Sequence, residues 1–367
     1  MNTKVKFLFS FLMITALIFG FVHIYFPSEN YNFERLHVFL FNLCTGGTIL
    51  LYYTQRQQGM SRIVQLFFVL SLVYALSAFF EVYPLTLAVS AVLWFLVEKI
   101  RVEKFSVLPL QFIQNSVPVT EKFHQASLLC LSTGIVMASM VIINNQYTHW
   151  IYMEKLNLNT FFLGYSFPLS LVTLSLIFGM LKKIEGRERK GIMEVCFWTI
   201  TLGVIIFFCF ILFERFIFQV FVTAALFTAV VMVLLLYYTF ADRIQQKLFL
   251  TSGIGFLIAT AVTGIAYISL HMQDSYDPMQ TKWLLHVHVF ASLYGWNLCG
   301  LSVICRFDDF PIKLHSPTVI VTHWITALVL APLGVFYGWA AILAILGYAY
   351  ITITLFFSDN AVVDHGR

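Results

Sequence analysis

Apolar residues occur in long runs along the whole chain, and short polar segments separate these runs. Each run is about 20 residues long, which lets an α-helix cross a hydrocarbon core about 30 Å thick. The pattern therefore predicts an all-α, polytopic integral membrane protein with about 12 transmembrane helices. The runs lie at 5–26, 35–54, 61–80, 82–100, 124–145, 159–181, 192–213, 216–240, 249–271, 283–306, 317–335 and 337–357.

The polar connections are short, and the longest covers roughly 101–123. We therefore expect a single transmembrane domain over 1–367. The third and fourth runs meet around 81–84, so the pattern leaves their limits open. No small-x-small cleavage signal follows the first run, which predicts a retained helix instead of a signal peptide.

Composition and charge add a topology to this pattern. Hydrophobic residues make up 60% of the chain and charged residues 11%, which excludes an ordinary soluble domain. With the N-terminus in the cytoplasm, the cytoplasmic segments, among them a solvated loop at 182–190, hold most of the 22 Lys and Arg residues. The outer segments hold four, namely Arg35, Lys155, Arg215 and Lys282. This asymmetry predicts cytoplasmic termini and a multi-pass protein of the inner (cytoplasmic) membrane, with lipid and not nucleic acid as its surroundings.

The six cysteines all fall within predicted spans, and the sequence contains no C-x-x-C pair. Buried cysteine usually behaves as a small hydrophobic residue. We therefore expect neither disulfides nor a covalently attached c-type haem.

Histidine is the residue type that points to chemistry. His286 and His288 open the tenth span, although imidazoles are costly in hydrocarbon and usually functional there. Residues two apart on an α-helix point about 200° away from each other, so this pair faces opposite flanks. His37 begins the second span at a similar predicted depth, as two imidazoles that share one haem would require. We interpret His23, His271 and His323 as hydrogen-bonded residues and not as ligands.

Two segments carry a family resemblance. The run Leu285-His-Val-His-Val-Phe-Ala-Ser-Leu-Tyr-Gly-Trp296 resembles the tenth helix of haem–copper oxidase catalytic subunits, and especially that of the cbb-type cytochrome oxidases. Arg35-Leu-His-Val-Phe-Leu-Phe-Asn-Leu-Cys-Thr-Gly-Gly47, continuing to Tyr52-Tyr53, is similar to the second helix of that family. The two motifs cover about 40 residues, and the twelve spans agree with the family in number and order.

The resemblance implies a haem–copper oxidase subunit I-like bundle with one or two b-type haems. His37 and His288 would be the axial pair of a low-spin haem. His286 would be the proximal ligand of a second, high-spin haem. Trp296 and Asn297 have no cofactor role in this interpretation and pack the helix.

The sequence departs from the family at the copper site. That site takes histidines from the sixth and seventh helices, whereas the sixth run here has Tyr165-Ser166 where Gly-His is expected. The sixth, seventh and eighth runs contain no histidine, and Cys196 and Cys209 alone are a poor replacement. We therefore predict no copper, and a non-haem iron site is disfavoured for the same reason.

The leading functional interpretation is a haem b-binding membrane protein of the haem–copper oxidase superfamily. It would transfer electrons, or bind or reduce a diatomic gas, O2 or NO, at a haem without copper. Whether it is an enzyme, an oxidoreductase such as a terminal oxidase or a nitric oxide reductase-like protein, stays open. Its donor would be a cytochrome c-type protein or a quinol, and other membrane subunits are possible partners. Two alternatives remain: a non-catalytic assembly or regulatory subunit with one or no haem, and a 12-helix solute transporter.

Overall fold

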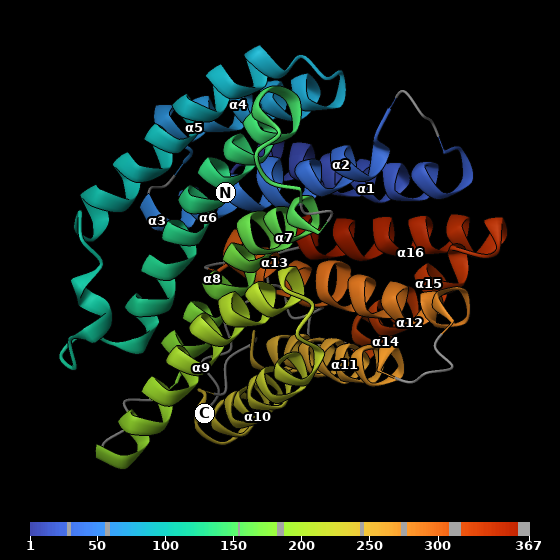
Figure 1. Cartoon of the computed structure of the whole chain (residues 1–367). Helices are drawn as coiled ribbons and strands as arrows, with labels where there is room; N and C mark the ends of the chain where they lie inside the picture. Colours follow the sequence, from blue (N-terminus) through green and yellow to red (C-terminus); the bar gives the residue numbers. More distant parts are fainter. Residues whose placement is uncertain are drawn as a thin grey trace. The chain divides into compact units, whose positions relative to one another are not determined.

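The computed structural model describes residues 1–27, 31–55, 59–152, 155–181, 187–242, 246–272, 277–307 and 317–358. The predicted all-α fold is confirmed, since these residues form helices and no β-strand (Figure 1). A single isolated bridge joins Leu181 and Ala241. Of the predicted cytoplasmic loop at 182–190, residues 182–186 lie outside the described residues.

Eleven described helices are long and apolar enough to cross a membrane. This supports a multi-pass membrane protein, and the helices follow the predicted runs closely. The exception is the fourth run, which forms α5 (Tyr83–Lys104), a helix whose last two turns carry five charged residues after Val97. The eleven helices are Thr3–Tyr25, Phe33–Gln55, Arg62–Phe79, Val119–Thr148, Phe162–Gly179, Lys190–Leu212, Phe216–Phe240, Gln246–His271, Trp283–Cys305, Pro317–Gly334 and Gly338–Phe357.

The chain divides into two compact units, Met1–Val172 and Thr173–Arg367. In the first unit, the second span packs against α1, α4 and the π-helical segment η4. This span is an α-helix that is interrupted by π-helical turns in its middle. Its parts are α2 (Phe33–Val38), η1 (Phe39–Gly47) and α3 (Thr48–Gln55). The other helices of this unit include α1 (Thr3–Tyr25), α4 (Arg62–Phe79), α6 (Val119–Ile143), η3 (Asn144–Thr148), α7 (Leu156–Phe161) and η4 (Phe162–Ser166).

The second unit repeats this local plan around the tenth span. That span packs against α11, α15, η7 and α16, and it also changes from α-helix to π-helix and back. Its parts are α12 (Pro278–Phe290), η5 (Ala291–Asn297) and α13 (Leu298–Cys305). The other helices of this part of the chain are α8 (Phe167–Gly179), which crosses the unit boundary, α9 (Arg187–Leu212), α10 (Phe216–Phe240), α11 (Gln246–His271), α14 (Pro317–Ile325), η7 (Thr326–Leu330), α15 (Ala331–Gly334) and α16 (Gly338–Phe357).

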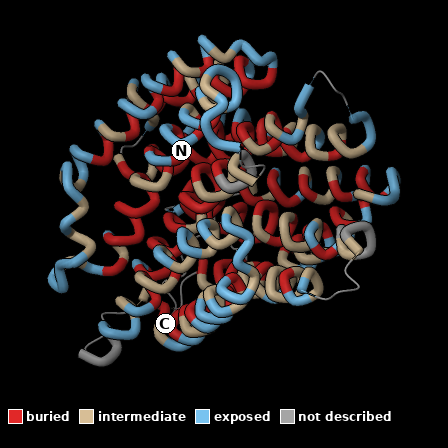
Figure 2. Tube along the Cα trace, in the orientation of Figure 1, coloured by how far each residue is buried: buried red, intermediate tan, exposed pale blue. Residues whose placement is uncertain are grey.

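Burial distinguishes the interior helices from the peripheral ones (Figure 2). In an apolar window of 18 residues, 83% of the window is buried in the second span and 78% in the tenth, against 22% in Lys190–Leu212. A span with a mostly exposed apolar surface is suited to contact with lipid. The spans that carry His37, His286 and His288 are therefore interior helices, where a side chain is held by protein instead of by lipid.

One tight turn and one close helix contact fix the first unit locally. Glu81, with φ of 60°, forms the turn between α4 and α5, which sets the limits that the sequence pattern left open. On α6, a Cβ added to Gly134 would collide with the backbone of Gly164 in η4. Only glycine permits two backbones to approach so closely.

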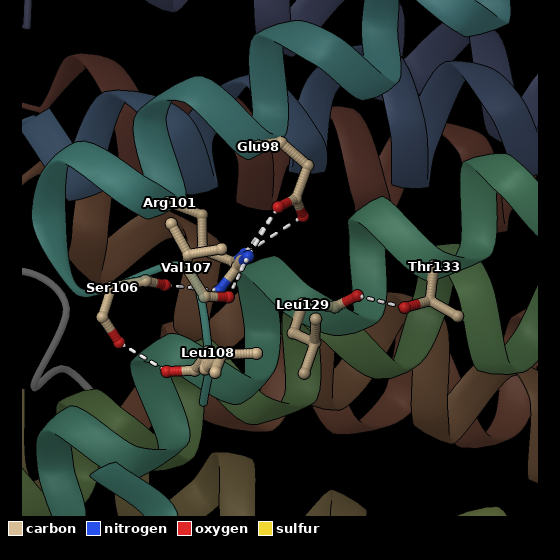
Figure 3. A network of polar contacts seen from close by, with 7 residues as sticks. All are labelled: Glu98, Arg101, Ser106, Val107, Leu108, Leu129 and Thr133. Carbon is tan, nitrogen blue, oxygen red and sulfur yellow. Dashed lines mark hydrogen bonds and ion pairs between the residues drawn. The ribbon is translucent and has the colours of Figure 1, made fainter. Parts of the chain in front are cut away.

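The charged end of α5 is closed by an arginine network (Figure 3). Arg101 is 4% exposed and donates hydrogen bonds to Glu98 at 2.6 to 3.0 Å, and to the carbonyl oxygens of Ser106 at 2.9 Å and Val107 at 3.1 Å. Burial opposes ionisation of Glu98, but the hydrogen bonds from Arg101 outweigh it, so the pKa of this carboxyl lies below its usual value. The network therefore ties the segment after α5 back onto the helix.

Candidate functional site

His37 lies at the end of α2, just before the π-helical segment η1, and is 8% exposed. Its Nδ1 lies 2.7 Å from the carbonyl oxygen of Ala16 on α1. One turn further along α1, a Cβ added to Gly20 would lie 3.1 Å from Nδ1 and 3.3 Å from Cε1 of the ring. The carbonyl orients the imidazole, and the glycine makes room for it.

His288 has the same surroundings in the second unit. Its Nδ1 lies 2.8 Å from the carbonyl oxygen of Thr260 on α11, and 3.4 Å from the Thr263 hydroxyl. One turn after Thr260, a Cβ added to Gly264 would lie 3.2 Å from Cε1 and 3.3 Å from Nδ1 of the ring. Both histidines therefore occupy a cradle of one backbone carbonyl and one glycine four residues later.

The likeness extends along both spans. His37-Val38-Phe39 and His288-Val289-Phe290 are identical triplets, and each is followed by Asn-Leu-Cys at 42–44 and at 297–299. The asparagines are at most 2% exposed and both cysteines are fully buried. In the second span the π-helical segment η1 contains the Asn-Leu-Cys triplet. In the tenth span η5 lies between the two triplets and ends at Asn297. Such π-helical turns are frequent at functional sites.

His286 lies on another flank of α12 than His288. Its ring is 6.4 Å from the ring of Phe336, which follows α15, and the two planes are nearly perpendicular. His288 instead faces α11 through the contact with Thr260. The two imidazoles therefore contact different neighbouring segments, as their spacing on the helix predicts.

Four other histidines in the described part of the chain have structural partners. His23 is partly exposed, and its Nε2 lies 3.6 Å from a carboxylate oxygen of Glu34. His323 is 1% exposed, and its Nε2 lies 2.7 Å from the carbonyl oxygen of Tyr294. His124 lies 2.8 Å from the Thr54 hydroxyl. His271 packs its ring 4.7 Å from that of Phe216. These contacts agree with a structural interpretation.

The two cradles suit an imidazole that binds a metal. A metal-bound histidine usually donates its second ring N–H to a carbonyl or a carboxylate, which fixes the tautomer and the ring orientation. In both cradles the carbonyl takes Nδ1, so an iron would bond to Nε2. The donor set and its support therefore fit a haem ligand in each unit.

The residues compared above with the copper site of the haem–copper oxidases have other surroundings. Tyr165 is fully buried in η4, and its hydroxyl lies 3.3 Å from that of Tyr74. On α9, Cys196 is buried and Cys209 is exposed, and thirteen residues of helix separate them by about 20 Å. Among the described residues, no group of three or more His, Cys, Asp or Glu side chains is placed to hold a metal ion.

Trp296 and Asn297 are fully buried in the tenth span. This agrees with the packing role expected for both. The ring of Trp296 lies against α11, where a Cβ on Gly253 would come within 3.5 Å of it.

Sequence reasoning identified the histidines but missed what supports them. Gly20 and Gly264 look like ordinary glycines in apolar helices, and the backbone of Ala16 or Thr260 carries no sequence signal. The repeated triplets were a usable signal, because in each span His-Val-Phe begins with a candidate ligand and Asn-Leu-Cys follows it.

A cavity of about 350 Å³ lies at one end of the first unit. It is formed by the start of the second span, by α4 and the first residue of α5, by the end of α6 with η3, and by the end of α7 with η4. Its polar lining residues include Asn32, Glu34, Arg35, Asn145, Gln146 and Thr160, and aromatic rings form much of the remaining wall.

Comparison of the chain with models of known protein families, with curated proteins and with solved structures found no match.

Proposed function

We propose that the chain is a haem b-binding membrane protein of the haem–copper oxidase superfamily that lacks copper. His37 and His288 would be the axial ligands of a low-spin haem, and His286 would be the proximal ligand of a second haem. A bis-imidazole haem is an electron carrier, whereas a haem with one open face binds a diatomic gas such as O2 or NO. The donor would be a cytochrome c-type protein or a quinol.

One observation carries the proposal. Each unit holds a histidine on an interior, π-interrupted span, with Nδ1 at 2.7 or 2.8 Å from a backbone carbonyl. A glycine one turn further along leaves space for each ring. A buried structural histidine such as His323 also takes a carbonyl partner. The support for the proposal is that the same carbonyl and glycine spacing recurs on two spans, as expected where a metal ligand needs its orientation fixed.

The alternative of a solute transporter is less well supported. Transporters usually place charged groups or broken helices around a substrate site near the membrane midplane. The buried cations in the described part of the chain, Lys6, Arg101, Lys122 and Arg306, instead lie near helix ends. Arg306 donates to the carbonyl oxygens of Phe356 and Ser358 at 3.1 Å and so caps the end of α16. The other alternative, a non-catalytic subunit with one or no haem, is distinguished from the proposed function by the haem content and the carbon monoxide response described below.

The test is a pyridine haemochrome assay on the purified protein, together with a reduced-minus-oxidised spectrum and carbon monoxide addition. We expect b-type haem, with a carbon monoxide response in part of it. The His37→Ala and His288→Ala variants should each lose the low-spin bands, and His286→Ala only the carbon monoxide response. His23→Ala is the matched control, because it removes an imidazole near the predicted outer end of the first span. It should keep both signals. Purified protein without any haem contradicts the proposal, and haem without a carbon monoxide response favours the non-catalytic subunit.

A further inference from the structure

The cavity in the first unit has features of a ligand site that the haem proposal does not use. Its volume of about 350 Å³ falls in the usual range for small-molecule sites. The positive-inside pattern predicts that this end of the second span lies at the outer membrane surface. A ligand here would therefore be amphipathic, with one side at the interface and the other in hydrocarbon.

Arg35 is the main unused donor at this cavity. Its Nη1 donates to the carbonyl oxygen of Ala78 at 2.9 Å, and among the described residues this is the one hydrogen bond of the guanidinium. A guanidinium has five N–H groups, so most of its donor capacity remains for a ligand. The bond to Ala78 holds the side chain at the cavity wall, and the ligand would have to present hydrogen-bond acceptors.

The deep wall is aromatic. The ring of Phe39 lies 5.2 Å from that of Tyr74 and 5.5 Å from that of Phe161, both nearly edge-on. The Tyr74 hydroxyl, which pairs with that of Tyr165 at 3.3 Å, adds one polar atom to this wall. Such a cluster favours a flat ring, because aromatic side chains gain energy from stacked and edge-to-face contacts.

The charge of the cavity selects against an anionic head group. Glu34 lines the cavity beside Arg35, and its carboxylate also pairs with His23 at 3.6 Å. One cation and one anion therefore offset each other, whereas phosphate recognition usually recruits several cationic donors. The uncharged Gln146 amide completes the polar side of the lining.

We propose that this cavity binds the head group of a membrane-soluble quinone. A quinone ring is flat and uncharged, and it carries two carbonyl acceptors at opposite positions. A membrane-soluble quinone also reaches the site from the bilayer. The role of the bound quinol as an electron source for a haem on His37 rests on the proposed function. Occupation of the cavity itself does not require a haem.

The test uses a photoreactive azidoquinone with the full-length protein in lipid nanodiscs, and decylubiquinone as competitor. Adducts mapped by mass spectrometry should fall within 31–39, 74–83, 138–146 or 160–162, and the competitor should remove them. Ala138→Leu fills the cavity from α6 and should reduce labelling by about tenfold or more, because the added methylenes and the ring compete for the same space. Ala88→Leu makes the same change on the exposed face of α5 and should leave labelling intact.

Arg35→Gln is a second variant that keeps the cavity open. It should also weaken labelling by about tenfold, as expected for loss of a charge-assisted hydrogen bond, while Arg35→Lys should retain more of it. Adducts elsewhere, or labelling that Ala138→Leu and Arg35→Gln leave unchanged, would overturn the proposal. A phospholipid that co-purifies in the cavity and resists decylubiquinone would overturn it as well. Haem without quinone labelling contradicts this inference alone, and quinone labelling without haem contradicts the proposed function alone.

Discussion

Replacing Gly20 with alanine adds one carbon atom beside the imidazole of His37. The new Cβ would lie 3.1 Å from Nδ1 and 3.3 Å from Cε1, closer than ordinary van der Waals contact. The ring must therefore move by a few tenths of an ångström, away from α1. That movement lengthens or tilts the 2.7 Å contact between Nδ1 and the carbonyl oxygen of Ala16.

The expected cost appears in haem binding and not in folding. Loss of a supporting hydrogen bond to a metal-bound histidine typically lowers metal affinity by about 10- to 100-fold. Alanine in a helix is also better than glycine by about 1 kcal/mol, so α1 itself should not be weakened. Gly20→Ala should then bind haem at least about tenfold more weakly while the melting temperature stays at or near that of the wild type.

The assay is haem content per protein from the pyridine haemochrome spectrum, measured over a series of added haem concentrations. Gly264→Ala should behave in the same way in the second unit. Gly191→Ala is the matched control, because it lies in the helix α9 and a Cβ there would meet nothing within 4 Å. If Gly20→Ala and Gly264→Ala both bind haem like the Gly191→Ala control, the cradle does not orient a ligand and the reasoning is wrong.

Three other predictions concern packing, the α5 network and metal content. Gly134→Ala should lower the free energy of unfolding by about 1–3 kcal/mol, because the added Cβ meets the backbone of Gly164, and a thermal melt against Gly191→Ala measures it. Arg101→Gln should cost on the order of 2 kcal/mol through its lost hydrogen bonds and speed proteolysis after α5. The depressed pKa of Glu98 makes its pairing stabilising above the usual carboxyl pKa of 4.5. That stabilisation is lost as the pH falls below 4.5, so the difference in melting temperature between wild type and Arg101→Gln should shrink there; an unchanged difference would exclude this pairing. Elemental analysis of the purified protein should find iron and no copper, and stoichiometric copper would contradict the predicted absence of a copper site.

The sequence by itself determined the helices, because each apolar run must satisfy its own backbone hydrogen bonds in hydrocarbon. The predicted helix limits at both ends of the chain therefore lie close to those of α1 and α16. The interruption of the second and tenth spans by π-helical turns was not visible in the hydrophobic pattern. Nor were the two compact units, since contacts between distant segments decide both features.

The candidate site was predictable only in part. An imidazole in an apolar run is conspicuous, so His37, His286 and His288 stand out in the sequence. Their supporting atoms are a backbone carbonyl and a missing side chain, neither of which has a residue-type signature. Only the tertiary structure brings Ala16 and Gly20 to His37, and Thr260 and Gly264 to His288, because helix packing sets which turn of one helix faces which residue of the next.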